Sequence, residues 1–272
     1  GYDSGDIYEY MPNGSESTFA SGMDYPTAMA ISSAGDVFVA NSANNASLTS
    51  GSITEFTPGG SKSTFASGID PQGLAFNSAG DLFESDYNSG NIYEFTPGGV
   101  RSTFATGFSF PLAMTFNSSG DLFVGNGYGD GSGAITEISP NGTESTLATG
   151  LNFPNGLAFN GAGDLFVSSA DGGTIYQYTP GGVQSTFATV DSGGLEGLAF
   201  DSAGNLFVAN PGNSIIEITP GGVQSTFAKG SVLFDQLAFQ PVPEPSVYAL
   251  LGIGAVGLLV FWRRSRRSFC SL

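Results

Sequence analysis

Residues 71–107, PQGLAFNSAGDLFESDYNSGNIYEFTPGGVRSTFATG, form one unit of a repeat that decides the fold. Within this unit, short apolar and aromatic runs alternate with clusters of Asn, Ser, Gly, Asp and Pro, the residues that turns prefer. The 3.6-residue apolar period of an amphipathic helix is absent. The unit therefore predicts four short strands, at residues 73–76, 82–85, 92–95 and 101–105.

The strands of the unit differ in character. The second strand, residues 82–85, is largely apolar on both faces in the sister units, which is typical of a strand packed between two neighbouring sheets. The fourth is short and polar, which protects a sheet edge from unwanted pairing. Before it, the sequence TPGG at 96–99 has Pro and Gly at the second and third positions of a type II turn, so we expect the positive φ at Gly98.

The unit occurs six times. Its marker, Ser-Thr-Phe-Ala or Ser-Thr-Leu-Ala, recurs at spacings of 46, 39, 43, 40 and 40 residues. Periods near 40 residues are typical of four-stranded propeller blades, whereas the coils of a parallel β-helix, the structural alternative, repeat at shorter periods. We predict an all-β, six-bladed β-propeller with four-stranded blades over residues 1–241. The marker threonines are Thr18, Thr64, Thr103, Thr146, Thr186 and Thr226.

Counting strands by type leaves one blade incomplete. First and third strands occur six times each, but second strands only five times. We expect the missing second strand just before Gly1, and we interpret the chain as truncated there because it has neither an initiator Met nor a signal peptide. The closing blade would take its first strand from residues 236–239 and its outer strands from residues 6–20. We expect it to be the least stable blade.

The repeats resemble those of NHL-type and gluconolactonase-like six-bladed propellers. The resemblance covers residues 1–239 and rests on PNGLAF (154–159) with GDLFV (163–167), and on PQGLAF (71–76) with GDLF (80–83). Such propellers host both enzymes and binding modules, so the resemblance implies the fold and leaves the activity open.

Composition excludes several classes of function. The net charge is −17, the chain has no His, and its one Cys is Cys270. Only Lys62, Arg101 and Lys229 are basic before residue 242, so the body would repel nucleic acid. Without His there is no His-based zinc site and no Ser-His or Cys-His nucleophile pair. No two carboxylates stand out as an acid/base pair, and we name no catalytic residue.

The sequence changes character at residue 242. A Pro-Glu-Pro motif is followed by an apolar run at 247–262. As a helix this run spans about 24 Å, slightly less than the roughly 30 Å of a bilayer core, and snorkelling arginines would help it to span. Arginines after the run place that end in the cytoplasm and the propeller outside. We predict a tail, 242–272, with one transmembrane helix at 247–262. Its signal residues are Pro243, Glu244, Pro245, Arg263, Arg264, Arg266 and Arg267.

The order of these three parts at the C-terminus resembles the PEP-CTERM sorting signal. The resemblance implies recognition by an exosortase-type membrane protease, cleavage near the Pro-Glu-Pro motif, and release or transfer to the cell surface. It also implies a signal peptide in the full protein and a transient anchor in the inner membrane. A plain tail anchor is the alternative interpretation.

The mouth of the channel is the candidate site. Positions directly before or at the start of the six first strands line one mouth of a propeller, and three adjacent blades carry Asn155, Glu196 and Asp235 there. Their oxygens suit a hard cation such as Ca²⁺. The gluconolactonase-like enzymes bind a divalent metal at this mouth, and Asn155 and Glu196 match two of their ligand positions. Thr27 and Leu112 depart from the other two. The alternative is that these polar side chains are simply solvated.

Three functions follow as hypotheses. The first is an exported, non-catalytic propeller on or released from the cell surface, which binds a polysaccharide, a surface protein or a matrix component. The second is a divalent-metal-dependent, lactonase-type hydrolase that uses Asn155, Glu196 and Asp235. The third is a purely structural component of a surface layer or biofilm.

Overall fold

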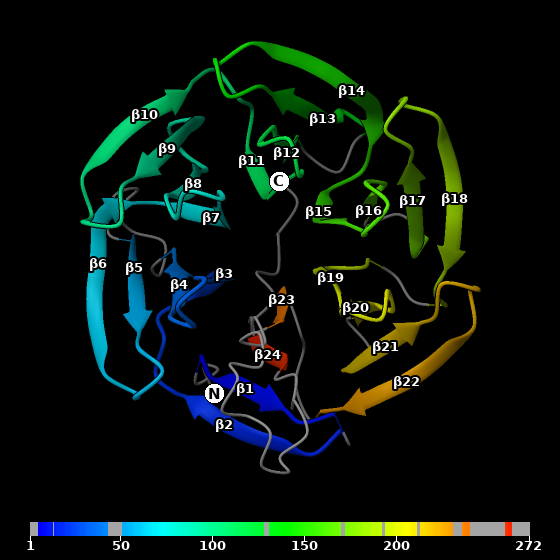
Figure 1. The fold of residues 1–272 in the computed structure, drawn as a ribbon, viewed down its shortest axis with the longest axis horizontal. Coiled ribbons are helices and arrows are strands. Elements are labelled where there is room, and N and C mark those ends of the chain that lie inside the picture. Colours follow the sequence, from blue (N-terminus) through cyan, green and yellow to red (C-terminus); the bar gives the residue numbers. More distant parts are fainter. Residues whose placement is uncertain are drawn as a thin grey trace, which may run out of the picture.

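The computed structural model describes residues 5–12, 14–42, 51–127, 131–169, 172–191, 194–210, 213–230, 236–239 and 259–262. These residues form six four-stranded antiparallel sheets, arranged as blades around a common axis (Figure 1). The prediction of an all-β propeller with four-stranded blades is confirmed. The division of the chain at residue 242 stays a prediction.

Five blades are built from four strands that are consecutive in sequence. In each, the first strand lies nearest the axis and the fourth lies at the rim (Figure 1). The first two blades contain β3 (Pro26–Ile31), β4 (Val37–Asn41), β5 (Gly51–Phe56), β6 (Lys62–Ile69), β7 (Pro71–Phe76), β8 (Leu82–Asp86), β9 (Asn91–Phe95) and β10 (Arg101–Ala105). The next two contain β11 (Pro111–Phe116), β12 (Leu122–Asn126), β13 (Gly133–Ile138), β14 (Glu144–Leu151), β15 (Pro154–Phe159), β16 (Leu165–Ser169), β17 (Thr174–Tyr178) and β18 (Gln184–Thr189). The fifth contains β19 (Leu198–Phe200), β20 (Leu206–Asn210), β21 (Ser214–Ile218) and β22 (Gln224–Lys229).

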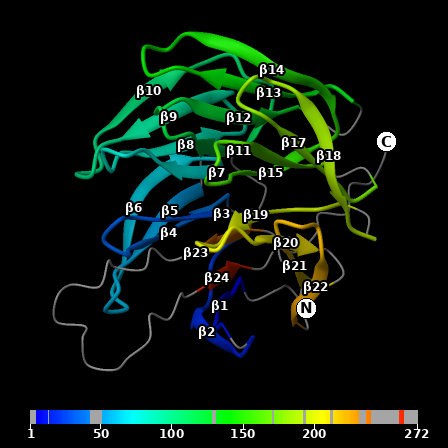
Figure 2. The same ribbon diagram turned by 45° about the vertical axis from the view of Figure 1, so that its right-hand side comes forward.

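The sixth, closing blade joins the two ends of the described chain. Its strands are β2 (Glu16–Ala20), β1 (Ile7–Tyr10), β24 (Leu259–Trp262) and β23 (Gln236–Phe239), in that spatial order (Figures 1 and 2). The first strand and the two outer strands come from the predicted segments. The second strand, which we expected from residues before Gly1, is β24.

The predicted helix at 247–262 is therefore wrong at its last four residues. Leu259 lies between Tyr10 and Phe239, and Trp262 lies between Ile7 and Gln236, in unbroken antiparallel register with both neighbours. The physical reason is that an apolar run can pair as a buried strand as well as coil into a helix when a gap between two strands is open to it. Residues 247–258 lie outside the described residues. Within the described part of the chain, no helix has the length and apolarity needed to cross a bilayer.

The core lies between neighbouring blades and repeats with them. The Phe at the second position of the second strand, such as Phe38 on β4, meets the Phe of its own fourth strand, Phe65, and the Phe that ends the next blade's first strand, Phe76, at 5.0 and 5.1 Å between ring centroids. The same edge-to-face contacts recur around Phe83, Phe166 and Phe207. Aromatic pairs favour this geometry. The marker Ser-Thr-Phe-Ala thus recurs because its aromatic residue closes the space between blades.

The turn before each fourth strand differs from the prediction. In 96–99 the residue with positive φ is Gly99, at +78°, rather than Gly98. The Gly99 amide donates to the Thr96 carbonyl at 2.8 Å, and the Thr96 amide donates to the Val100 carbonyl at 3.1 Å. A left-handed fourth residue is typical of a type I turn followed by a G1 bulge, and it explains why the fourth position of this turn is Gly in all six repeats.

Hydrogen bonds join the inner strands of adjacent blades. The Ser85 hydroxyl donates to the Leu112 carbonyl and the Ser168 hydroxyl donates to the Glu196 carbonyl, both at 2.7 Å. The Thr27 hydroxyl donates to the Pro71 carbonyl at 2.5 Å. Because these carbonyls belong to first strands or to the loops that enter them, the bonds fix the backbone at the mouth of the channel.

Candidate functional site: the channel mouth and an outer groove

The structure brings two of the three predicted mouth residues together. Asn155 is the second residue of β15, and Glu196 precedes β19 in the next blade. The Asn155 amide Nδ2 donates to Glu196 Oε2 at 3.0 Å, and both side chains are half-buried. The third residue, Asp235, lies outside the described residues.

A glutamine reaches over the intervening blade to the same place. Gln236, the first residue of β23, donates its Nε2 to the Asn155 backbone carbonyl at 3.2 Å. β15, β19 and β23 are therefore linked by side chains at this end of the molecule. Sequence analysis missed Gln236, because β23 and β15 are 81 positions apart and only the ring closure brings them close.

The remaining mouth positions do not converge on a ligand. Thr27 is buried and its hydroxyl is engaged with Pro71. Leu112 is apolar, and its carbonyl accepts the Ser85 hydroxyl. Within the described ranges, no group of three or more Asp, Glu, Cys or His side chains is placed to hold a metal. Ca²⁺ takes roughly six to eight oxygens, so the described part of the mouth supplies only a portion of such a site.

One carboxyl group is fully buried between the blades. Glu84, on β8, is 0% exposed, and neither of its oxygens has a hydrogen-bond partner among the described residues. The equivalent residues of the other consecutive blades are valines, Val39, Val124, Val167 and Val208. Burial, and then the nearby Asp86 carboxylate, raise the pKa of Glu84 well above its ordinary value of 4.5. Burial therefore favours the protonated, neutral form of this group over its carboxylate.

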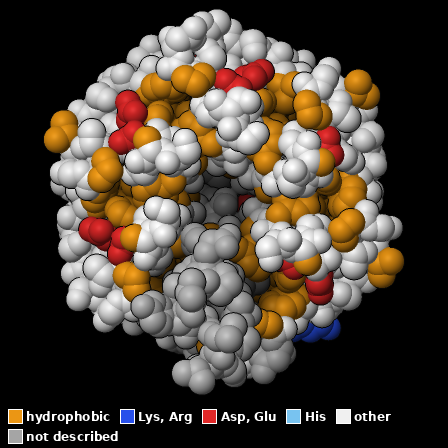
Figure 3. Space-filling model, in the orientation of Figure 1, with side chains coloured by type: hydrophobic (Ala, Val, Ile, Leu, Met, Phe, Trp, Pro, Cys, Tyr) orange, Lys and Arg blue, Asp and Glu red, His pale blue; other side chains and the backbone are white. Residues whose placement is uncertain are grey.

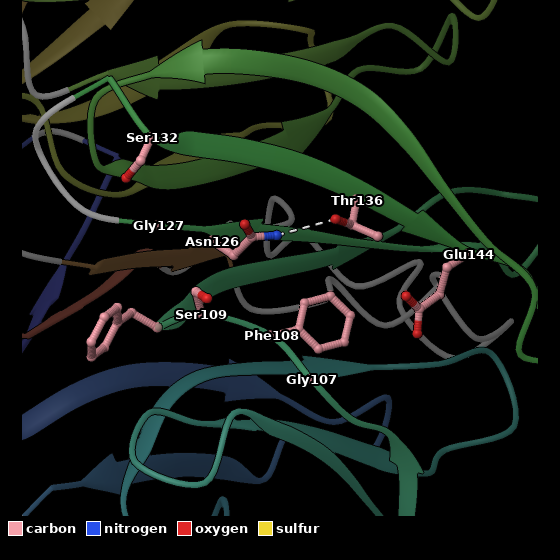
Figure 4. Close-up of a pocket in the computed structure, with 9 residues that line it drawn as sticks. Gly107, Phe108, Ser109, Asn126, Gly127, Ser132, Thr136 and Glu144 are labelled. Atoms are coloured by element: carbon pink, nitrogen blue, oxygen red, sulfur yellow. Dashed lines mark hydrogen bonds between the residues drawn. The ribbon is translucent and has the colours of Figure 1, made fainter.

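An outer groove is the second candidate site. It lies between the loop that follows β10 and the sheet β11–β14, with a volume of about 630 Å³. Figure 4 shows Phe108 in the middle of this groove, Asn126 and Thr136 on one wall, and Glu144 at one end. Sites for small ligands in proteins typically enclose roughly 300–1,000 Å³.

The loop that forms the groove has a strained backbone. Phe110, directly before Pro111, has φ +52°, and its equivalents Tyr25 and Phe153 have +49° and +42°. Large side chains rarely adopt this conformation, and such strain is concentrated at functional sites. The signal in the sequence is an aromatic residue between a turn residue and the Pro that opens a first strand. It was not used in the sequence analysis.

The surface around the ring is acidic. Figure 3 shows acidic side chains spaced around one face of the molecule and a hollow at its centre. Among the basic residues of the body, Lys62 and Arg101 lie at the rim on β6 and β10, over the rings of Phe56 and Tyr93. Their positive charge is therefore turned to the outside of the ring.

Comparison with known proteins identifies the tail. A family model described as the PEP-CTERM protein-sorting motif matches residues 241–267. The tail carries a sorting signal. The motif indicates exosortase-sorted export, with a transient membrane anchor, to the cell envelope or surface. Its signal residues, Pro243, Glu244, Pro245 and the four arginines from Arg263, lie outside the described residues, so their individual roles stay a prediction.

Solved structures share the propeller fold. A candidate gluconolactonase has a TM-score of 0.71 at 16% identity, with 98% of this chain and 96% of that chain covered. The calcium-binding protein regucalcin from Agrobacterium tumefaciens has 0.69 at 16%, with 90% and 92% covered. A chain of the nidogen/laminin complex has 0.70 at 17%, with 82% and 93% covered. No curated protein sequence matches this chain. At such low identity the likeness shows the gluconolactonase-like propeller fold alone.

Proposed function

We propose that the protein is a non-catalytic binding propeller that acts at the cell surface or outside the cell. The observation that carries this proposal is the sorting motif at 241–267, joined to a propeller whose described mouth has two oxygen-bearing side chains in contact and no carboxylate cluster. An exported acidic propeller whose described mouth holds no carboxylate cluster is suited to holding a surface or matrix component.

The experiment that tests this proposal follows the protein in the cell. An epitope inserted in the propeller of the wild-type chain should become accessible to added protease at the cell surface or appear in the medium. The variant Glu244→Ala should keep its tail and stay in the membrane fraction. Wild-type protein that stays inside the cell would contradict the proposal, and so would surface display that is unchanged by Glu244→Ala or by removal of the exosortase.

A metal-dependent hydrolase of the lactonase type is the second candidate. The hydrogen bond between Asn155 and Glu196 favours it, because it brings two possible oxygen ligands together on adjacent blades. Asp235 would complete the set. A thermal melt in calcium and in chelator separates the candidates, since an ion bound only by the folded state raises the melting temperature.

Glu196→Gln is the matched control for that melt. It keeps the shape of the side chain and its contact with Asn155 but removes the charge. A calcium-dependent rise in the wild-type chain that is lost in Glu196→Gln, followed by turnover of lactones or esters, would establish the hydrolase. The absence of a rise in both chains would leave the binding propeller.

A further inference from the structure

The groove between the β7–β10 and β11–β14 blades presents an aromatic surface to solvent. Phe110 is 41% exposed, although large apolar side chains are otherwise mostly buried in this protein. Its ring lies 5.0 Å from that of Tyr87, centroid to centroid, with 47° between the planes. Tyr87 belongs to the neighbouring blade, so two loops jointly hold a pair of partly exposed rings, of which Phe110 lines the groove and Tyr87 packs against it.

The backbone holds this aromatic surface in place. Phe110 has φ +52° and is followed by Pro111, which fixes the direction of the chain into β11. The Gly127 amide donates to the Ser109 carbonyl at 2.9 Å, which ties the loop to the end of β12. A large residue is thus held in a costly conformation with its ring partly exposed to solvent.

Polar groups on the wall of the groove are arranged for neutral hydrogen bonding. Asn126 donates its Nδ2 to the Thr136 hydroxyl at 3.1 Å, which orients the amide and leaves its Oδ1 to accept a bond from a ligand (Figure 4). The side chain of Ser109 is exposed on the facing loop. An oriented amide and a hydroxyl opposite aromatic rings are groups that recognise the hydroxyls and the apolar face of a sugar.

Charge narrows the class of ligand. Glu144 is the one charged residue among the described residues that line the groove, and neither Lys nor Arg is among them. The whole chain carries −17. An anionic polysaccharide would be repelled and would find no cation to pair with.

We propose that this groove binds a neutral polysaccharide, with sugar rings stacked on Phe110 and Tyr87 and sugar hydroxyls bonded to Asn126. This inference rests on the proposed function, because it names the class of ligand that a surface-displayed binding propeller would hold. The groove lies on the β11–β14 blade, next to the blade that carries Asn155, and its described lining includes neither Asn155 nor Glu196, so binding in the groove does not require a metal at the mouth.

The test measures binding of defined hexasaccharides to the full chain by titration calorimetry. The probes are cellohexaose and mannohexaose as neutral chains and hexagalacturonate as an anionic chain of equal length. We expect at least one neutral chain to bind and the anionic chain to fail. Phe110→Ala should weaken binding at least tenfold, whereas Phe153→Ala, the same left-handed position before Pro154 on the next blade, should leave it unchanged.

A second variant separates loss of binding from loss of folding. Ser109→Tyr adds bulk at an exposed position whose backbone bond to Gly127 is kept, so the melting temperature should stay while binding is lost. Failure of both neutral chains to bind, equal binding by Phe110→Ala, or preference for hexagalacturonate would overturn the inference. Surface display without glycan binding would overturn the proposal for the groove alone. Failure of surface display would overturn the proposed function, and the calorimetry would still decide whether the groove binds a glycan.

Discussion

The closing blade and the β19–β22 blade have the same four-stranded order but are assembled in different ways. The β19–β22 blade folds from consecutive residues, with short turns between antiparallel neighbours. The closing blade needs residues 7–20, 236–239 and 259–262, so its pairing closes nearly the whole chain into a loop. Loop closure costs conformational entropy before the contacts form. The ring is therefore expected to open first at the closing blade.

The residue types of the second strand also differ between the two blades. Val260 occupies the register position of Phe207, which contacts Phe227 and Phe239 in the β19–β22 blade and its neighbour. Trp262 occupies the position of Ala209, which is small and 0% exposed. The strand β24 thus has apolar residues in a matching register, but with sizes that differ from those of the repeat.

Removal of the tail should have the largest effect. A chain of residues 1–240 lacks β24, so β1 and β23 lose their shared neighbour. We expect its melting temperature to fall by more than about 10 °C, with faster amide exchange in β1, β2 and β23 than in β19–β22. A chain that lacks only residues 263–272 is the control and should melt like the full chain. Equal melting of the 1–240 chain would show that β24 does not stabilise the blade.

The two blades can be compared with one substitution. Ile7 and Ile215 are equivalent third-strand residues, each 0% exposed. Ile215→Ala should lower the free energy of unfolding by about 2–5 kcal/mol through loss of contacts and the cavity that remains. Ile7→Ala should cost less, because the closing blade opens before the rest of the ring. Chemical denaturation measures both, and a larger cost for Ile7→Ala would contradict the order of stability inferred here.

The five consecutive blades are not equivalent, because the β7–β10 blade has Glu84 where the others have Val. Replacing it by the residue of its sister blades, Glu84→Val, should raise the free energy of unfolding by about 1–3 kcal/mol at neutral pH, since a buried carboxyl without a partner is removed. The control is Val124→Glu, which places a carboxyl at the equivalent position and should destabilise.

The pH dependence of this effect has a defined sign. The folded chain keeps the Glu84 proton to a higher pH than the unfolded chain, whose carboxyl titrates near the ordinary value of 4.5. Stability is therefore lost as the pH rises from about 4.5 toward the raised folded pKa, and the advantage of Glu84→Val should grow over that window. An advantage that is constant from pH 4 to pH 8 would show that Glu84 does not titrate as inferred.

The repeat was enough to predict most of the fold. The Ser-Thr-Phe-Ala marker, the alternating first strands and the turns predicted the blades and their four strands, because each blade is a local structure with neighbours close in sequence. The left-handed residue of the 96–99 turn was misplaced by one position, since a type II turn and a type I turn with a bulge both use Pro and Gly. Asn155 and Glu196, which the sequence analysis assigned to one mouth on adjacent blades, form a hydrogen bond, while the metal site itself stays a prediction.

The sequence by itself determined the six repeats, the acidic body without His, and the sorting signal at 241–267, since each is a property of composition, period or motif. Only the tertiary structure decided which segment completes the closing blade, how Gln236 reaches Asn155, and where Phe110 and Tyr87 meet beside a groove. The physical reason is that these contacts depend on closing the ring and on packing one blade against the next. They join residues from different repeats, and the local sequence of one repeat does not specify which residues of other repeats it will contact.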